Sequence, residues 1–153
     1  MTVAGIVLIL DQAVKWLALR HLPLGLPRAV IDGFFSLTLV MNPGLAFGML
    51  GTVPPGWRWV VALLSVFAVG VLATLATRLL PEGGRIAALA IGMIFGGAAG
   101  NLIDRARFGA VVDFLDFYWR GWHWPAFNVA DSAISVGVAL LALRMLTASP
   151  PQA

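Results

Sequence analysis

The chain has 153 residues, of which 60% are hydrophobic and 11% are charged, and its mean hydropathy of +0.93 excludes an ordinary soluble domain. The net charge is +3, but the ten basic residues are spread thinly around apolar segments, so nucleic acid is not an expected partner. The chain contains no cysteine, which excludes a disulfide framework, a thiolate nucleophile and a cysteine-based metal site.

Residues 1–153 are predicted to form one integral membrane domain, mainly α, with four transmembrane helices at about 1–22, 57–79, 85–105 and 125–146. Each is long enough to cross a hydrocarbon core of about 30 Å. The first contains Asp11 and Lys15, four residues apart, which should neutralise each other on one helix face. It is expected to be a membrane helix rather than a cleaved signal peptide, because no basic residue precedes its apolar run and no small-residue cleavage site follows it.

Two long connections are predicted on one side of the membrane. In the first, residues 28–51 form a β-rich segment, in which an aromatic and β-branched run at 34–41 ends in a turn at Asn42-Pro43-Gly44. The second long connection covers 107–124, whereas 80–84 is a short turn on the other side. We expect the chemistry on the side of the long connections, where all six tryptophans also lie.

Charge counting alone predicts the opposite orientation from the one adopted below. Seven of the ten Lys and Arg residues lie on the side of the long connections, and the positive-inside rule would place that side in the cytoplasm. Composition therefore leaves the orientation open.

The third helix carries Gly92, Gly96 and Gly100, whose spacing of four permits another helix to approach closely. Packing alone and a contribution to a site explain these glycines equally well. The helical aspartates Asp104 and Asp131 each follow an asparagine by three residues, which predicts an amide and a carboxylate on one helix face. A single such pair favours polar contact between helices, whereas two at the same depth favour a site.

Three aspartates, Asp104, Asp113 and Asp131, carry the functional prediction. A carboxylate within a membrane costs about 2.5–3.5 kcal/mol on insertion scales, so such a residue indicates a functional site. Counting along the helices places Asp104 and Asp131 near one membrane surface. A break near Gly109 would let Asp113 join them, because on a continuous helix it would face away from Asp104. Asp116 is expected to be a solvated loop residue.

Other interpretations are weaker. His21 and His123 form no zinc-binding pattern, and Ser132 lacks the Gly-x-Ser-x-Gly setting of a serine hydrolase. His123 is expected at the membrane interface. A proton- or ion-coupled carrier is the main alternative, since intramembrane aspartates also line such paths. A scaffold that binds lipid or helices without catalysis is a third possibility. The clustering of the aspartates near one face favours an enzyme.

Five stretches, taken together and in order, resemble lipoprotein signal peptidase (signal peptidase II), the membrane aspartic peptidase of bacteria. They are 11–15 (DQAVK), 42–47 (NPGLAF), 97–105 (GAAGNLIDR), 111–114 (VVDF) and 127–132 (FNVADS). The chain departs from the family at its short N-terminus.

The resemblance implies four transmembrane helices with both termini cytoplasmic and a small extracytoplasmic β-cradle. It implies cleavage of the signal peptide from diacylglyceryl-modified prolipoproteins, before the lipidated cysteine, at the extracytoplasmic face of the bacterial inner membrane. Membrane lipid and globomycin-type inhibitors are further implied partners. We follow this orientation rather than the charge count.

The resemblance also assigns roles to residues. Asp113 and Asp131 are the implied catalytic dyad; supporting or substrate-positioning roles fall to Asp11, Lys15, Asn42, Asn101, Asp104, Arg105 and Asn128. Two close carboxylates in a poorly solvated site cannot both ionise, so one keeps a proton while the other activates water. This chemistry requires neither a metal nor a cofactor, and which aspartate begins protonated is left open.

Overall fold

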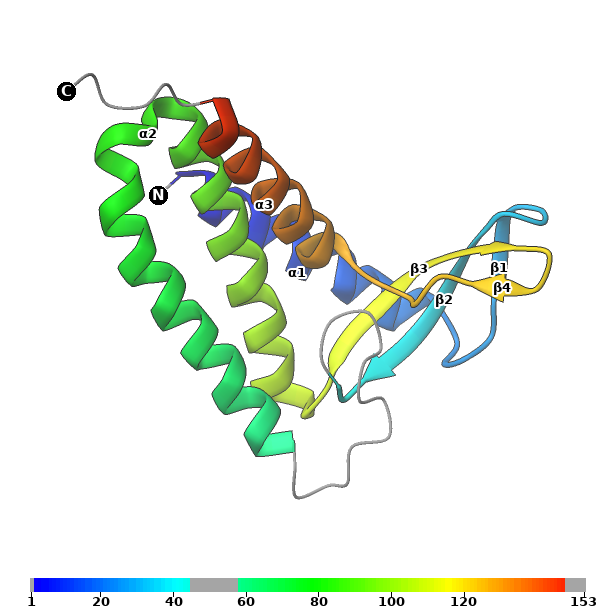
Figure 1. The fold of residues 1–153 in the computed structure, drawn as a ribbon. Coiled ribbons are helices and arrows are strands. Elements are labelled where there is room, and N and C mark those ends of the chain that lie inside the picture. Colours follow the sequence, from blue (N-terminus) through cyan, green and yellow to red (C-terminus); the bar gives the residue numbers. More distant parts are fainter. Residues whose placement is uncertain (1, 45–57, 148–153) are drawn as a thin grey trace.

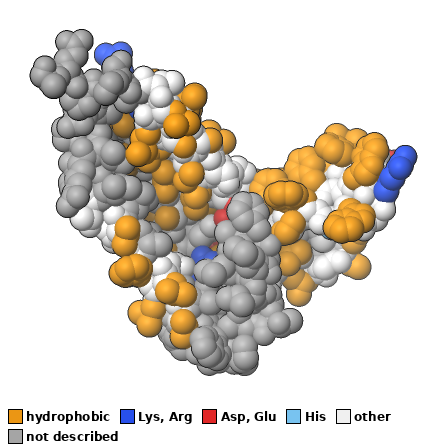
Figure 2. Space-filling view, in the orientation of Figure 1, with side chains coloured by type: hydrophobic (Ala, Val, Ile, Leu, Met, Phe, Trp, Pro, Cys, Tyr) orange, Lys and Arg blue, Asp and Glu red, His pale blue; other side chains and the backbone are white. Residues whose placement is uncertain are grey.

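The structure, a computed structural model, describes residues 2–44 and 58–147, and the side chains of residues 58–83 only in part. Its helices are α1 (Thr2–His21), α2 (Arg58–Phe108) and α3 (Val129–Thr147), and its strands are β1 (Arg28–Ile31), β2 (Phe35–Asn42), β3 (Val111–Trp119) and β4 (Trp122–His123). Figure 1 shows a helical arm and a sheet arm that meet at an angle. Hydrophobic side chains cover much of both arms, and an acidic side chain is visible in the angle between them (Figure 2).

Helix α2 folds back on itself at Gly84, whose φ of 62° and ψ of −153° are not helical. Glycine adopts such a positive φ without steric cost. The two halves of α2 therefore run in opposite directions, and α1 begins, α2 turns and α3 ends at the end of the helical arm that lies away from the sheet (Figure 1).

Within the described residues, three helical segments are long and apolar enough to cross a membrane. They are Thr2–His21, Gly84–Phe108 and Val129–Thr147. The first half of α2, which begins at Arg58, corresponds to the helix predicted at 57–79. The structure thus establishes three candidate spans, and the fourth transmembrane helix stays a prediction.

The glycines of the third predicted helix lie directly against α1. A Cβ added at Gly92 would lie 2.9 Å from a valine Cβ of α1, and one at Gly96 would lie 2.6 Å from the carbonyl oxygen of Ala4. At Gly100 an added Cβ would collide with the carboxylate of Asp11. The predicted close helix approach is confirmed, and at Gly100 it also brings a charged side chain into the contact.

The sheet is antiparallel in the order β1-β2-β3-β4. Strand β2 covers the run that was predicted as a strand, whereas β3 and β4 occupy much of the connection predicted at 107–124. The two aspartates within β3 hid its strand pattern, because charged residues are depleted in strands. Residues 45–51 of the predicted β-rich segment lie outside the described residues.

A small core joins the sheet to the helical arm. Ala18 of α1 packs with Leu39 of β2 and with Val112 and Phe114 of β3, and all four are buried. Because strand side chains alternate between faces, this core covers one face of β3 and leaves the neighbouring positions for the opposite face. The arrangement fixes β3 next to the end of α2.

Candidate active site

A glycine turn brings the strand β3 back to the end of α2. Helix α2 ends at Phe108, and Gly109 follows with a φ of 68°. The N–H of Gly109 donates to the carbonyl oxygen of Arg105 at 2.9 Å, which closes the last turn of the helix. The carboxylate of Asp104 then accepts the N–H of Val112 at 3.1 Å. The predicted break near Gly109 is confirmed, and it places Asp113 close to Asp104.

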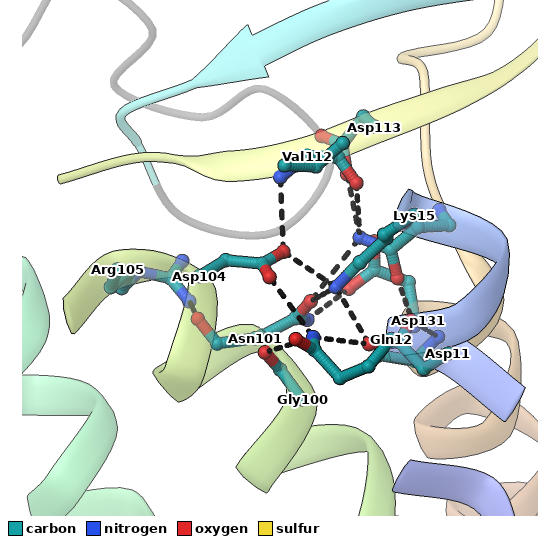
Figure 3. Close-up of polar contacts among 12 residues, drawn as sticks. Asp11, Gln12, Lys15, Gly100, Asn101, Asp104, Arg105, Val112, Asp113 and Asp131 are labelled. Carbon is teal, nitrogen blue, oxygen red and sulfur yellow. Dashed lines mark hydrogen bonds and ion pairs between the residues drawn. The ribbon is translucent and has the colours of Figure 1, made fainter. Parts of the chain in front are cut away.

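Lys15 forms ion pairs with two buried carboxylates. Its Nζ lies 2.9 Å from Asp11 Oδ2 and 2.7 Å from Asp104 Oδ2, and it donates to Asn101 Oδ1 at 2.9 Å (Figure 3). Such a buried cluster is tolerated only when its charges are paired and hydrogen-bonded. The predicted contact between Asp11 and Lys15 is confirmed. The sequence did not reveal Asp104 as a further partner, because spacing along one helix says nothing about a second helix.

Two further contacts complete this charged centre. Gln12 Nε2 donates to Asp104 Oδ1 at 3.0 Å and to the carbonyl oxygen of Gly100 at 3.2 Å. Asp11 Oδ1 accepts the N–H of Ala130 at 2.9 Å. The centre therefore ties α1 to both α2 and α3. Gln12 was not predicted as a site residue, although its place one residue after Asp11 offered a signal.

Asn128 and Asp131 cap the start of α3. Asn128 Oδ1 accepts the N–H of Asp131 at 2.9 Å, and Asp131 Oδ2 accepts the N–H of Asn128 at 3.3 Å, which is a reciprocal capping arrangement. Phe127 forms a β-bridge with Leu115, so α3 begins at Val129 rather than near residue 125. Asp131 thus lies in the first turn, where the helix dipole favours a negative charge.

The two asparagines link the carboxylates of different elements. Asn128 Nδ2 donates to Asp113 Oδ1 at 2.7 Å and to Asn101 Oδ1 at 3.2 Å, and Asn101 Nδ2 donates to Asp131 Oδ1 at 2.7 Å. The spacing of Asn101 and Asp104 predicted an amide and a carboxylate on one helix face; in the structure the Nδ2 of Asn101 donates to Asp131 on α3. Through these amides Asp113 and Asp131 belong to one hydrogen-bonded group.

Asp113 is buried in an environment that favours its protonated form. Its side chain is 1% exposed, and Asn42 Nδ2 donates to its Oδ2 at 3.0 Å. Burial and, next, the negative charge of Asp131 raise the pKa of Asp113 to about 7, against the hydrogen bonds from Asn42 and Asn128 and the charge of Lys15. A carboxyl group with this pKa can hold or release a proton near neutral pH.

Arg105 connects α2 to the chain that follows β2. Its Nη2 donates to the carbonyl oxygen of Gly44 at 3.0 Å, and its Nη1 donates to that of Asn101 at 3.4 Å. The N–H of Gly44 in turn donates to Asn42 Oδ1 at 3.0 Å. Arg105 therefore holds the segment that presents Asn42 to Asp113. Residues 45–47 of the NPGLAF stretch lie outside the described residues.

The prediction that Asp116 is a solvated loop residue is wrong. Asp116 is buried on β3, where its Oδ2 accepts hydrogen bonds from Ser36 Oγ at 3.1 Å and Thr38 Oγ1 at 2.9 Å, and its Oδ1 lies 2.8 Å from His123 Nδ1. Burial raises the pKa of Asp116, but the hydrogen bonds from His123, Thr38 and Ser36 outweigh it and lower the pKa overall. By strand alternation Asp116 faces away from Asp113.

Across residues 2–44 and 58–147, no group of three or more His, Cys, Asp or Glu side chains is arranged to hold a metal ion. The described site contains two buried carboxyl groups joined by neutral amides, and the side-chain oxygen of Asn101 connects them to the charged centre around Lys15.

Comparison with known proteins identifies close relatives. A family model described as signal peptidase (SPase) II matches residues 3–147. A lipoprotein signal peptidase of Geobacter sulfurreducens is 52% identical over 139 residues, covering 91% of this chain and 86% of that protein. One of Nitratidesulfovibrio vulgaris is 43% identical over 150 residues, covering 97% and 90%. A solved structure described as a bacterial membrane enzyme has a TM-score of 0.76 at 28% identity, covering 99% of this chain and 92% of that one.

Proposed function

The chain belongs to the signal peptidase II family of proteases, and from that membership we propose that it is an intramembrane aspartic endopeptidase. Its substrates are bacterial prolipoproteins that carry a diacylglyceryl group on a cysteine, and it cleaves the signal peptide on the N-terminal side of that cysteine. Asp113 and Asp131 are its catalytic dyad.

One observation carries the choice of the dyad from among the buried carboxylates. Asp11 and Asp104 both form an ion pair with the ammonium of Lys15. Asp113 and Asp131, by contrast, receive their side-chain hydrogen bonds from neutral amides. A carboxyl group that must gain and lose a proton during catalysis needs such a setting, because a bound cation would keep it ionised.

The chemistry follows from one proton shared by two carboxyl groups. The ionised member of the dyad takes a proton from water, and the resulting oxygen attacks the carbonyl carbon of the cleaved peptide bond. The protonated member donates a hydrogen bond to the carbonyl oxygen, and a proton then passes to the leaving amine as the C–N bond breaks. Because the two groups interact, they titrate as a pair.

The remaining site residues hold this pair in position. Asn101 and Asn128 orient the carboxylates, and Asn42 supports Asp113 from β2. Arg105 holds the segment around Asn42 through the carbonyl oxygen of Gly44. Asp11, Lys15 and Asp104 form the charged centre that fastens α1 to α2 next to the dyad.

The purified protein provides the decisive test. We expect Asp113→Asn and Asp131→Asn each to abolish cleavage of a lipidated prolipoprotein while the protein still inserts into membranes. Asp32→Asn, which alters an exposed acid in the turn between β1 and β2, is the matched control and should cleave normally. Retained cleavage by either dyad variant would remove the assignment. Proton flux through proteoliposomes in the absence of peptide would instead support the alternative function, a proton- or ion-coupled carrier.

The same proposal includes the placement of the protein in the membrane. We propose that residues 1–153 form one domain with four membrane spans, both ends cytoplasmic, and the dyad near the extracytoplasmic face of the inner membrane. The common position of the start of α1 and the end of α3 supports this arrangement (Figure 1). Membrane lipid and globomycin-type inhibitors are the further partners proposed.

Because the chain has no cysteine, single cysteines can report its orientation. A maleimide that cannot cross membranes should label the Asp32→Cys variant in cells whose outer membrane is permeable, and should leave Arg85→Cys unlabelled. The reverse pattern would show that the charge count, rather than the family, predicts the orientation.

A further inference from the structure

A cavity of about 330 Å³ lies beside Asp131, between the first turns of α3 and the segment that precedes the helix. Its lining residues are Trp124, Phe127, Asp131, Ser132, Ser135 and Val136. Four of these residues belong to α3 and share one helix face, because Ser135 follows Asp131 by four residues and Val136 follows Ser132 by four. This space, which we call the α3 cavity, therefore extends from Asp131 for about one turn along the helix.

The aromatic wall of the α3 cavity is fixed to the sheet. The ring of Phe127 stacks on that of Phe117 with centroids 5.8 Å apart. The backbone of Phe127 exchanges hydrogen bonds with Leu115, from N to O at 3.1 Å and in return at 2.9 Å. Ring stacking and strand pairing thus fix the position of Phe127 at the cavity.

The lining favours an occupant without hydrogen-bonding groups. The rings of Trp124 and Phe127 and the side chain of Val136 are apolar, and the hydroxyl of Ser132 already donates to the carbonyl oxygen of Asn128 at 2.9 Å. Asp131 and Ser135 add polar groups to the lining, but its accessible surface is mainly apolar, so a peptide backbone placed here would find few partners for its donors and acceptors. A hydrocarbon chain has no such groups.

The position of the α3 cavity indicates where that chain comes from. Ser135 and Val136 are exposed on α3, a helix long and apolar enough to span the membrane, so this end of the cavity is continuous with the lipid-facing surface. The other end touches Asp131. The volume is at the low end of the range for ligand pockets, about 300–1,000 Å³, and suits one chain rather than two.

We propose that the α3 cavity binds one acyl chain of the substrate's diacylglyceryl group. This inference rests on the proposed function, in which the lipid is attached to the residue directly after the cleaved bond. That residue must lie next to the dyad during cleavage. Because a short thioether joins the lipid to its side chain, the acyl chains must begin close to the dyad and extend from there. The α3 cavity offers a path from Asp131 to the bilayer.

The α3 cavity acts by positioning more than by affinity. A chain that moves from lipid tails into an apolar cavity leaves one hydrocarbon environment for another, so it gains little hydrophobic free energy. Holding the chain instead restricts the orientation of the neighbouring carbonyl relative to the dyad. We therefore expect acyl-chain length to alter kcat as well as KM.

A matched pair of substitutions on α3 tests the proposal. Val136 lines the α3 cavity and is 49% exposed, whereas Val138 is 52% exposed and does not belong to the lining. Val136→Trp should lower kcat/KM about tenfold for a dipalmitoyl substrate, the size of effect typical of one overpacked side chain. Cleavage of a dibutyryl substrate with the same peptide should change by less than about twofold, because its chains are too short to fill the cavity. Val138→Trp should leave both unchanged.

Three results would overturn the proposal. They are an equal loss on both substrates, an unaltered dependence on chain length, or a changed preference for the peptide residues beside the cut. Ser135→Leu fills the same space and must reproduce the selectivity change if Val136→Trp folds poorly. If the parent protein cleaves neither substrate, the proposed function itself fails, which separates that outcome from failure of the α3 cavity.

Discussion

Strand β3 carries two buried aspartates three residues apart, and its two faces treat them in opposite ways. Asp113 receives hydrogen bonds from two amides and lies near the carboxylate of Asp131, and its pKa is raised to about 7. Asp116 lies against two hydroxyl groups and His123, and its pKa is lowered. Both side chains are almost fully buried.

The difference shows that burial does not by itself determine how an acid behaves. Burial raises the pKa of both residues, but the neighbours decide the outcome. At Asp113 the adjacent negative charge acts with burial, whereas at Asp116 the hydrogen bonds outweigh it. One face of β3 therefore holds a group that can exchange protons, and the other holds a carboxylate that fastens strands β2, β3 and β4 together.

The largest difference should appear in catalysis. If Asp113 carries a reacting proton and Asp116 does not, Asp113→Asn should lower kcat by at least about 10³-fold, in the range expected for loss of an acid–base group. Asp116→Asn should stay within about threefold of the parent. Single-turnover cleavage by purified protein checks both. Equal losses in the two variants would contradict the division of roles between the faces.

For the stability of the fold, Asp116 should matter more than it does for catalysis. Asp116→Ala leaves the hydroxyls of Ser36 and Thr38 without their buried acceptor, which should cost about 1–3 kcal/mol in the free energy of unfolding. Thermal unfolding in detergent measures this loss, and Ser36→Ala combined with Thr38→Ala should make the Asp116 substitution less harmful. A fully stable Asp116→Ala protein would mean that these hydrogen bonds contribute nothing.

The smallest effect expected is a shift in pH dependence. The pKa of Asp113 is raised to about 7, so above this pH the pair loses the proton that its two carboxyl groups share, and activity should fall as the pH rises. Asn42 hydrogen-bonds the ionised form and lowers the pKa of Asp113, so Asn42→Ala should raise that pKa and move the alkaline limb of the kcat profile upward by about 0.5–1 unit. Thr38→Ala, on the opposite face, should leave this limb in place. A limb that moves to lower pH would contradict the assigned role of Asn42.

The sequence predicted the site best where one residue type is costly or sterically special. Aspartates in an apolar chain marked Asp104, Asp113 and Asp131, and Gly109 marked the break that lets β3 return to α2. The cluster made by Asp104 and Lys15 and the group linked by Asn101 needed three-dimensional information, because their partners are on separate helices. Asp116 was misassigned because its strand was not recognised, and its contacts with β2 and with His123 of β4 could not be read from the sequence.

The position of Asp11 has a consequence for how the protein is made. The ion pair with Lys15 lies within a single helix, so α1 can enter the bilayer during synthesis with its charges already matched. Asp104 emerges later and finds its counter-charge only when α2 docks against α1 through its glycines, and Ala130 reaches Asp11 after that. The order of translation thus matches the order in which charges are compensated. A nascent chain with Lys15→Met would carry the unmatched carboxylate of Asp11 in lipid from the moment α1 inserts, and faster proteolytic turnover of that chain is the expected cellular result.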